Sequence, residues 1–141
     1  MLEATNHMVI PPFRNESYID PSDPGVREKM RSAIEALRSE SKEYDLMVGG
    51  EPISTEKRIL SRNPANPEEI VGRVSSANMG IVDKALNCAY KAFESWSMLP
   101  AYERVKPFLR AAEIMRQKRF ELDATMILEV GKSWIEADAD L

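Results

Sequence analysis

The sequence contains only one cysteine, Cys88, and one histidine, His7. A lone cysteine excludes a disulfide bond within the chain and is typical of proteins from a reducing compartment. A structural zinc site needs about four ligands, drawn mostly from cysteine and histidine, so two such residues are too few. We therefore expect neither a disulfide framework nor a metal site.

Long apolar runs and clusters of basic residues are also missing. The N-terminal stretch 2–10 is interrupted by Glu3, Asn6 and His7, so it matches neither a secretory signal nor a membrane span. The formal net charge is −4 over 141 residues, whereas nucleic-acid binding needs a clustered cationic surface. We expect a cytoplasmic protein that binds neither nucleic acid nor membranes.

The usual signatures of catalysis and phosphate binding are absent. Cys88 lies inside a helical pattern, where it is expected to act as a small apolar side chain and not as a nucleophile. Gly49-Gly50 is a hairpin-turn signal. Gly131-Lys132-Ser133 follows a helical pattern and not a strand, so it is not a phosphate-binding loop.

The acidic residues near the C-terminus are the next candidates for metal ligands. Glu136 and Asp140 share one face of a helix, whereas Asp138 points away from that face, so the three do not form an oxygen cage. We interpret them as charge at a helix N-terminus and a solvated helix face. The residues by themselves therefore predict no catalytic, no cofactor-binding and no metal-binding residue.

The first 23 residues are rich in proline and show no periodicity. We expect an extended arm over residues 1–23 that lies on another surface, anchored by Phe13 and Tyr18. A frayed terminus is the equal alternative.

Residues 24–43 carry apolar side chains at helical spacing, which predicts an amphipathic helix. In residues 44–75 short apolar runs are separated by turn signals at Gly49-Gly50 and at residues 63–67. We expect antiparallel strands there, as a long hairpin followed by a shorter strand that Gly72 interrupts. Strands of this kind expose edges that need a partner sheet or a covering domain.

Residues 78–141 predict a series of amphipathic helices. Gly131 can end one helix in the left-handed conformation, and Ser133 with Glu136 forms a capping box that begins the next. That last helix stops within about two turns without a C-terminal capping signal, which we interpret as truncation of a longer protein. The chain is expected to be one domain, or one piece of a larger domain.

Several motifs, taken in order, resemble the aldehyde dehydrogenase superfamily. Its hairpin, turn and helix signatures are similar to LMVGGE (46–51), SRNPANP (61–67), KAFESW (91–96), LRAAEIMR (109–116) and EVGKSWIEA (129–137). The opening PFRNE (12–16) and the ending EADAD (136–140) favour the 1-pyrroline-5-carboxylate dehydrogenase subfamily. Each motif is weak alone, but their order and spacing together are strong.

The resemblance implies an α/β aldehyde dehydrogenase-like fold for the parent enzyme. Residues 1–141 would be the N-terminal part of that domain, mostly helical with short antiparallel strands near 44–75. The complete enzyme would use NAD to oxidise L-glutamate γ-semialdehyde, formed from 1-pyrroline-5-carboxylate, to glutamate in proline and arginine catabolism. It would be a homo-oligomer.

In this family a cysteine thiolate captures the aldehyde, a glutamate activates water, and an asparagine stabilises the oxyanion. The resemblance places all of these, and the NAD-binding turn, beyond residue 141. It therefore assigns no catalytic or cofactor-binding residue here. It implies that the chain alone is inactive and binds no NAD, and that its partner is the remainder of the dehydrogenase.

Two other readings stay open. The chain could be a non-catalytic helical module that docks on a partner through its apolar faces. It could also belong to another aldehyde dehydrogenase subfamily, because substrate choice is encoded downstream.

Overall fold

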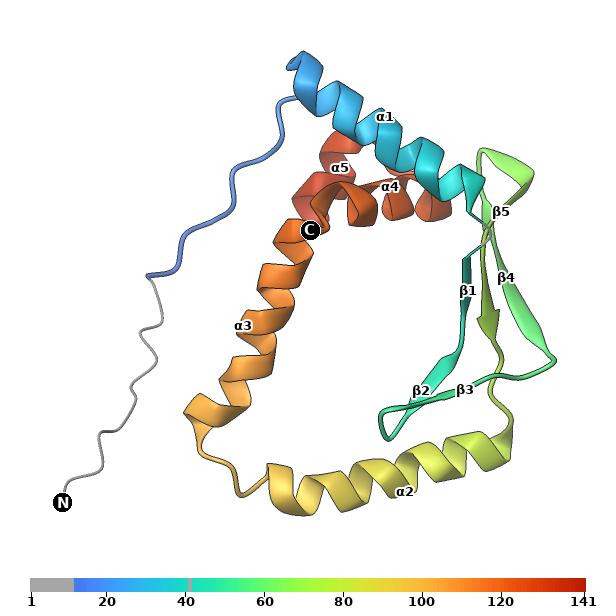
Figure 1. Ribbon diagram of the computed structural model, residues 1–141, viewed down its shortest axis with the longest axis vertical. Helices are drawn as coiled ribbons and strands as arrows, with labels where there is room; N and C mark the ends of the chain where they lie inside the picture. Colours follow the sequence, from blue (N-terminus) through green and yellow to red (C-terminus); the bar gives the residue numbers. More distant parts are fainter. Residues whose placement is uncertain (1–11, 41) are drawn as a thin grey trace.

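The computed structural model describes residues 12–40 and 42–141. Their helices and short strands are arranged as the sides of an open frame (Figure 1). His7 lies outside the described residues. The helices are α1 (Pro24–Ser39), α2 (Met79–Trp96), α3 (Ala101–Gln117), α4 (Arg119–Val130) and α5 (Trp134–Asp140). The strands are β1 (Lys42–Tyr44), β2 (Leu46–Val48), β3 (Glu51–Ile53), β4 (Arg58–Asn63) and β5 (Asn66–Ser75).

The first helix begins as its sequence signals require but ends earlier than expected. The Asp23 carboxylate accepts hydrogen bonds from the backbone N–H groups of Gly25 and Val26, as an N-cap does. Helix α1 ends at Ser39, and Lys42–Tyr44 is strand β1 where a helix to residue 43 was expected. The reason is tertiary: this short segment pairs with β5, and local helix propensity is too weak to oppose that pairing.

The longer sheet has the order β1-β5-β4, with β5 in the centre. Strands β4 and β5 form the antiparallel hairpin that the turn at residues 63–67 predicts. Strand β1 instead runs parallel to β5, with Lys42 opposite Gly72 and Tyr44 opposite Val74. The antiparallel pairing expected in residues 44–75 is present between β2 and β3 and between β4 and β5, whereas β1 is an additional strand that pairs in parallel.

Strand β5 also differs from the sequence expectation, because it is ten residues long and is not a short final strand. Gly72 does not interrupt it. A Cβ atom at Gly72 would lie 3.5 Å from the ring of Tyr44, an ordinary van der Waals distance, so the strand packs against this ring without a steric need for glycine. Strands β2 and β3 form a separate small hairpin around Gly49 and Gly50, whose φ angles are 64° and 86°.

The hydrophobic core is small and lies where α1 and α4 pack on each other and on β5, in the upper part of Figure 1. Its buried side chains are Leu37, Val71, Ala124 and Leu128, with Ala33 and Ile34 packed against them. Neither α2 nor α3 has a buried residue. The two longest helices therefore form the lower and left sides of the frame without contributing to the core.

The junction between α4 and α5 confirms two local predictions. Gly131 adopts the left-handed conformation at the end of α4, with φ 74°. The Ser133 backbone N–H donates to Glu136 Oε2 over 2.9 Å, and the Glu136 N–H donates to Ser133 Oγ over 3.3 Å. This reciprocal capping box turns α5 back beside α4.

Gly131→Ala is expected to destabilise the protein more than Gly50→Ala. Both residues have positive φ, so each alanine costs about 1–2 kcal/mol in backbone conformation. Only at Gly131 would the new Cβ also meet another group, Pro64 Cγ at 3.1 Å, whereas nothing lies within 4 Å at Gly50. Urea unfolding should show an additional loss of about 1 kcal/mol for Gly131→Ala. Equal losses for the two variants would show that the Pro64 contact is unimportant.

Candidate functional site

The arm docks on the junction of α4 and α5 through polar contacts. Arg119, at the start of α4, donates from Nε to Asp138 Oδ1 over 2.6 Å and from Nη2 to the Ser17 carbonyl over 2.7 Å. The Ile19 backbone N–H donates to Asp138 Oδ2 over 2.9 Å. Arg119 and Asp138 therefore join the arm, α4 and α5 through hydrogen bonds. We call Arg119, Asp138 and Asp123 the arm cluster.

Asp138 was interpreted from the sequence as part of a solvated face, and this is wrong. Its side chain is 1% exposed in the ion pair with Arg119. The hydrogen bond from Arg119 to Asp138 raises the pKa of the guanidinium, so Arg119 keeps its positive charge. The other two carboxylates are exposed: Glu136 caps α5, and Asp140 pairs with Lys132.

Asp123 is the residue of this cluster that sequence reasoning missed. It is fully buried on α4, and neither of its carboxylate oxygens has a hydrogen-bond partner among the described residues. Burial raises its pKa to about 6; the negative charge of Asp138 also raises it, and Arg119 opposes the shift. A signal was present: Asp123 is three residues after Phe120 and four before Ile127, on the apolar side of the helical pattern.

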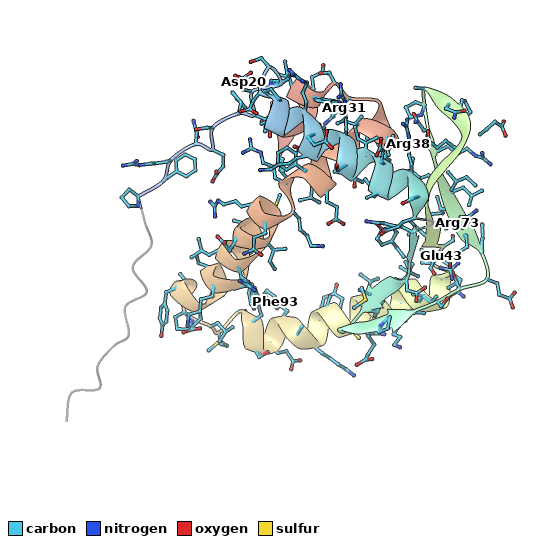
Figure 2. The ribbon with its side chains drawn as sticks, turned by 45° about the horizontal axis from the view of Figure 1, so that its top comes forward. Asp20, Arg31, Arg38, Glu43, Arg73 and Phe93 are labelled. Carbon is cyan, nitrogen blue, oxygen red and sulfur yellow. The ribbon has the colours of Figure 1, made fainter. Side chains whose placement is uncertain are left out.

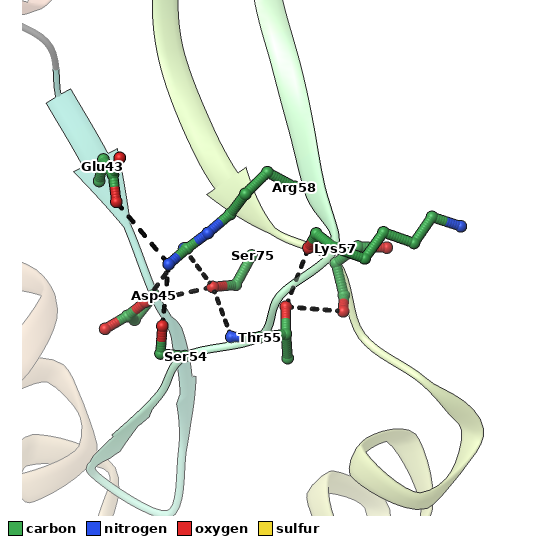
Figure 3. Close-up of polar contacts among 8 residues, drawn as sticks. Glu43, Asp45, Ser54, Thr55, Lys57, Arg58 and Ser75 are labelled. Atoms are coloured by element: carbon green, nitrogen blue, oxygen red, sulfur yellow. Dashed lines mark hydrogen bonds and ion pairs between the residues drawn. The ribbon is translucent and has the colours of Figure 1, made fainter.

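A second polar cluster surrounds Arg58 on β4 (Figure 3). The guanidinium donates to Ser75 Oγ over 2.5 Å, to Asp45 Oδ1 over 3.2 Å and to Ser54 Oγ over 2.8 Å. Ser75 is buried at the end of β5, and Asp45 links β1 to β2. Within the cluster the buried Ser75 hydroxyl donates to Asp45 Oδ1 over 3.1 Å. The cluster ties the small hairpin to the larger sheet, which is a structural role.

A groove of about 900 Å³ lies between the arm and α3. On the α3 side it is lined by Leu109, Ala112, Met115 and Arg116, and residues from the arm include Phe13 and Tyr18. Phe13 is 89% exposed and Tyr18 is 73% exposed, so neither side chain anchors the arm on the described residues, and their role as anchors on another surface stays a prediction. The arm is held by backbone and charged groups instead.

The outer helices carry an uncovered apolar stripe. On α2 the exposed fractions are 39% for Val82, 53% for Leu86 and 63% for Phe93. Figure 2 shows Phe93 near the end of α2, close to the start of α3. Cys88, on the same helix, is half-buried, and its Sγ would lie 3.3 Å from a Cβ at Gly49, so it packs on the hairpin turn.

Residues 12–40 and 42–141 hold no group of three or more histidine, cysteine, aspartate or glutamate side chains placed to bind a metal ion. Within the same residues, no helix combines the length and apolarity needed to cross a membrane. That the chain carries no catalytic or cofactor-binding residue stays a prediction.

Comparison with known proteins links this geometry to one family. The model of the aldehyde dehydrogenase family matches residues 52–141. The 1-pyrroline-5-carboxylate dehydrogenase of Geobacillus kaustophilus is 39% identical over 133 residues, which are 94% of this chain and 26% of that protein. The chain thus spans about a quarter of the length of the curated relatives it matches.

Solved structures give the same result for the fold. A 1-pyrroline-5-carboxylate dehydrogenase from Thermus with bound NAD superimposes with a TM-score of 0.90 at 40% identity, covering 94% of this chain and 26% of that one. The enzyme from Mycobacterium tuberculosis bound with NAD and cobalamin gives a TM-score of 0.83 at 26% identity, covering 94% of this chain and 25% of that one. These likenesses confirm the expected fold class, helical with short strands as in part of an aldehyde dehydrogenase.

Proposed function

Because the chain belongs to the aldehyde dehydrogenase family, we propose that it is the N-terminal part of an NAD-dependent enzyme. That enzyme oxidises L-glutamate γ-semialdehyde, formed from 1-pyrroline-5-carboxylate, to glutamate in proline and arginine catabolism. The names of the similar proteins and structures support this substrate and cofactor. The proposal includes a homo-oligomeric parent enzyme, and the cytoplasmic location stays a prediction.

The proposal rests on two observations: the chain matches only part of its relatives, and its two longest helices contribute no buried residue to its core. The matched region is 94% of this chain but 26% of the relative. Helices α2 and α3 present apolar side chains that nothing in the described residues buries. Exposed apolar side chains that run along two neighbouring helices are typical of an interface. In the proposed enzyme the remainder of the dehydrogenase covers it.

The described residues do not fit a dinucleotide-binding site. Dinucleotide pyrophosphates are held where a glycine-rich turn leads from a strand into a helix. The described glycines with positive φ are Gly49 and Gly50, in the turn of a β-hairpin, and Gly131, at the end of α4. We therefore propose that the remainder of the dehydrogenase binds NAD and supplies the catalytic groups, and that this part supports their scaffold.

A chimera tests the proposal. In it, this chain replaces the aligned segment of the Geobacillus kaustophilus enzyme, and NADH formation from 1-pyrroline-5-carboxylate is measured. We expect turnover by the chimera and none by residues 1–141 alone. Turnover that copurifies with the isolated chain would contradict the proposal. An inactive chimera, together with a cooperatively melting monomer for the isolated chain, would favour the helical interaction module.

A further inference from the structure

We propose that Asp123 is a proton-controlled latch for the arm. When Asp123 is protonated, Arg119 holds the arm on the junction of α4 and α5. When Asp123 is ionised, it competes for Arg119, and the arm contacts weaken. This inference rests on the geometry of the arm cluster and is independent of the proposed enzymatic function.

The contacts of the arm make it sensitive to charge. It is held by Arg119 on the Ser17 carbonyl, by Asp138 on the Ile19 N–H, and by Arg116 Nε on Glu16 Oε1 over 2.6 Å. Its large apolar side chains, Phe13 and Tyr18, are mostly exposed and contribute little burial. An arm attached mainly by polar contacts is released when the charges that make them are redistributed.

Arg119 interacts electrostatically with the carboxylates of Asp138 and Asp123, but of these two it forms a hydrogen bond only with Asp138. Asp138 is satisfied by both Arg119 and the Ile19 N–H. Asp123 follows Arg119 by four residues on α4, the spacing at which helix side chains are neighbours, yet it accepts no hydrogen bond among the described residues. A rotamer change of Arg119 would therefore transfer its hydrogen bonds from the arm and Asp138 to Asp123.

The other charged groups around α4 are engaged elsewhere. They include Lys29 of α1 over the Phe120 ring, Arg116 of α3 on Glu16, Glu69 of β5 on Arg38, Glu129 of α4 on Ser61 of β4, and Glu121 of α4 on both Lys42 and Lys118. Of the charges that act on Asp123, Asp138 disfavours its ionised form and Arg119 favours it. Arg119 is thus the cation available to an ionised Asp123.

The direction of the switch follows from the cost of burying a charge. An ionised carboxylate without hydrogen bonds is strongly disfavoured in a buried site, so ionisation of Asp123 drives Arg119 towards it. The pKa of Asp123 is raised to about 6, so the carboxyl is protonated below this pH and ionised above it. The arm is consequently held in mildly acid solution and loosened at neutral and alkaline pH.

Amide hydrogen exchange of Ile19 in the 141-residue chain tests the latch. After correction for the intrinsic rate, we expect about tenfold greater protection of the Ile19 N–H near about pH 5 than near about pH 7.5. In Asp123→Asn the amide carries no charge at either pH, so protection should stay high at both. Asp83→Asn, an exposed position on α2, is the matched control and should keep the pH dependence.

A second measurement keeps the test decisive if Asp123→Asn folds poorly. The carboxyl carbon of Asp123, followed by NMR in the unmodified chain, should titrate with a midpoint of about 6 together with the Ile19 amide shift. The proposal is overturned if Ile19 protection is the same at both pH values. It is also overturned if Asp123 titrates at its ordinary value, or if the pH dependence persists in Asp123→Asn.

Discussion

Leu128→Ala is expected to lower the free energy of unfolding by about 3 kcal/mol, because it removes a large side chain from the centre of a small core. Leu128 is 3% exposed and packs with Leu37 of α1, Val71 of β5 and Ala124 of its own helix. Alanine would leave a cavity at the point where the helices and the sheet meet. No other part of the described chain has a comparable buried cluster to compensate.

Val130→Ala is the matched control for this prediction. Val130 lies in the last turn of the same helix, and 59% of its surface is exposed. Its truncation should change the free energy of unfolding by about 0.5 kcal/mol or less. Urea denaturation of both variants beside the unmodified chain gives the comparison. Equal losses would mean that the cluster around Leu128 does not hold α1, α4 and β5 together.

Leu86→Glu is expected to have a small effect in the isolated chain and a large one in the chimera. In the isolated chain Leu86 is 53% exposed on α2, so glutamate should alter stability by about 0.5 kcal/mol or less. In the chimera with the Geobacillus kaustophilus enzyme, the proposal expects the same position to be covered by the rest of the chain. There an unpaired buried carboxylate is strongly destabilising, and activity should fall by at least about tenfold.

Asn87→Glu provides the control for the added charge. Asn87 is the next residue along α2 and is exposed, and it lies off the apolar stripe formed by Val82, Leu86 and Phe93. Glutamate at this position adds the same charge to the same helix turn. The chimera carrying Asn87→Glu should therefore keep its activity. A similar loss in both variants would point to net charge and not to a buried face.

Local signals in the sequence predicted much of the fold. Gly131 can reach the left-handed conformation without penalty, so it was identified as a helix end from its residue type. The Ser133–Glu136 capping box and the Gly49-Gly50 turn were found in the same way, because each depends on residues within a few positions of one another. These predictions are confirmed.

Features that depend on distant residues were not predictable. The parallel pairing of β1 with β5 joins segments about thirty residues apart, and nothing in Lys42–Tyr44 itself specifies a partner. Strand β5 was expected to be short because Gly72 lowers strand propensity, but β1 on one side and β4 on the other support its full length. Tertiary pairing outweighed the local signal in both cases.

The arm cluster shows the same limit for side chains. Asp138 looked solvent-exposed because its partners, Arg119 and Ile19, come from other parts of the chain. Asp123 occupies a position on the apolar side of its helix, which could have marked it as a buried carboxylate. Its lack of a hydrogen-bond partner could be seen only once α4, α5 and the arm were placed together.

The central claim is that the remainder of an aldehyde dehydrogenase chain packs on the apolar face of α2. The most direct test is the rate of NADH formation by the Leu86→Glu and Asn87→Glu chimeras, measured at equal protein concentration with 1-pyrroline-5-carboxylate. We predict that Leu86→Glu loses at least about tenfold of the activity, while Asn87→Glu matches the unmodified chimera. Full activity in the Leu86→Glu chimera would contradict the claim, because that face would then be open to solvent in the working enzyme.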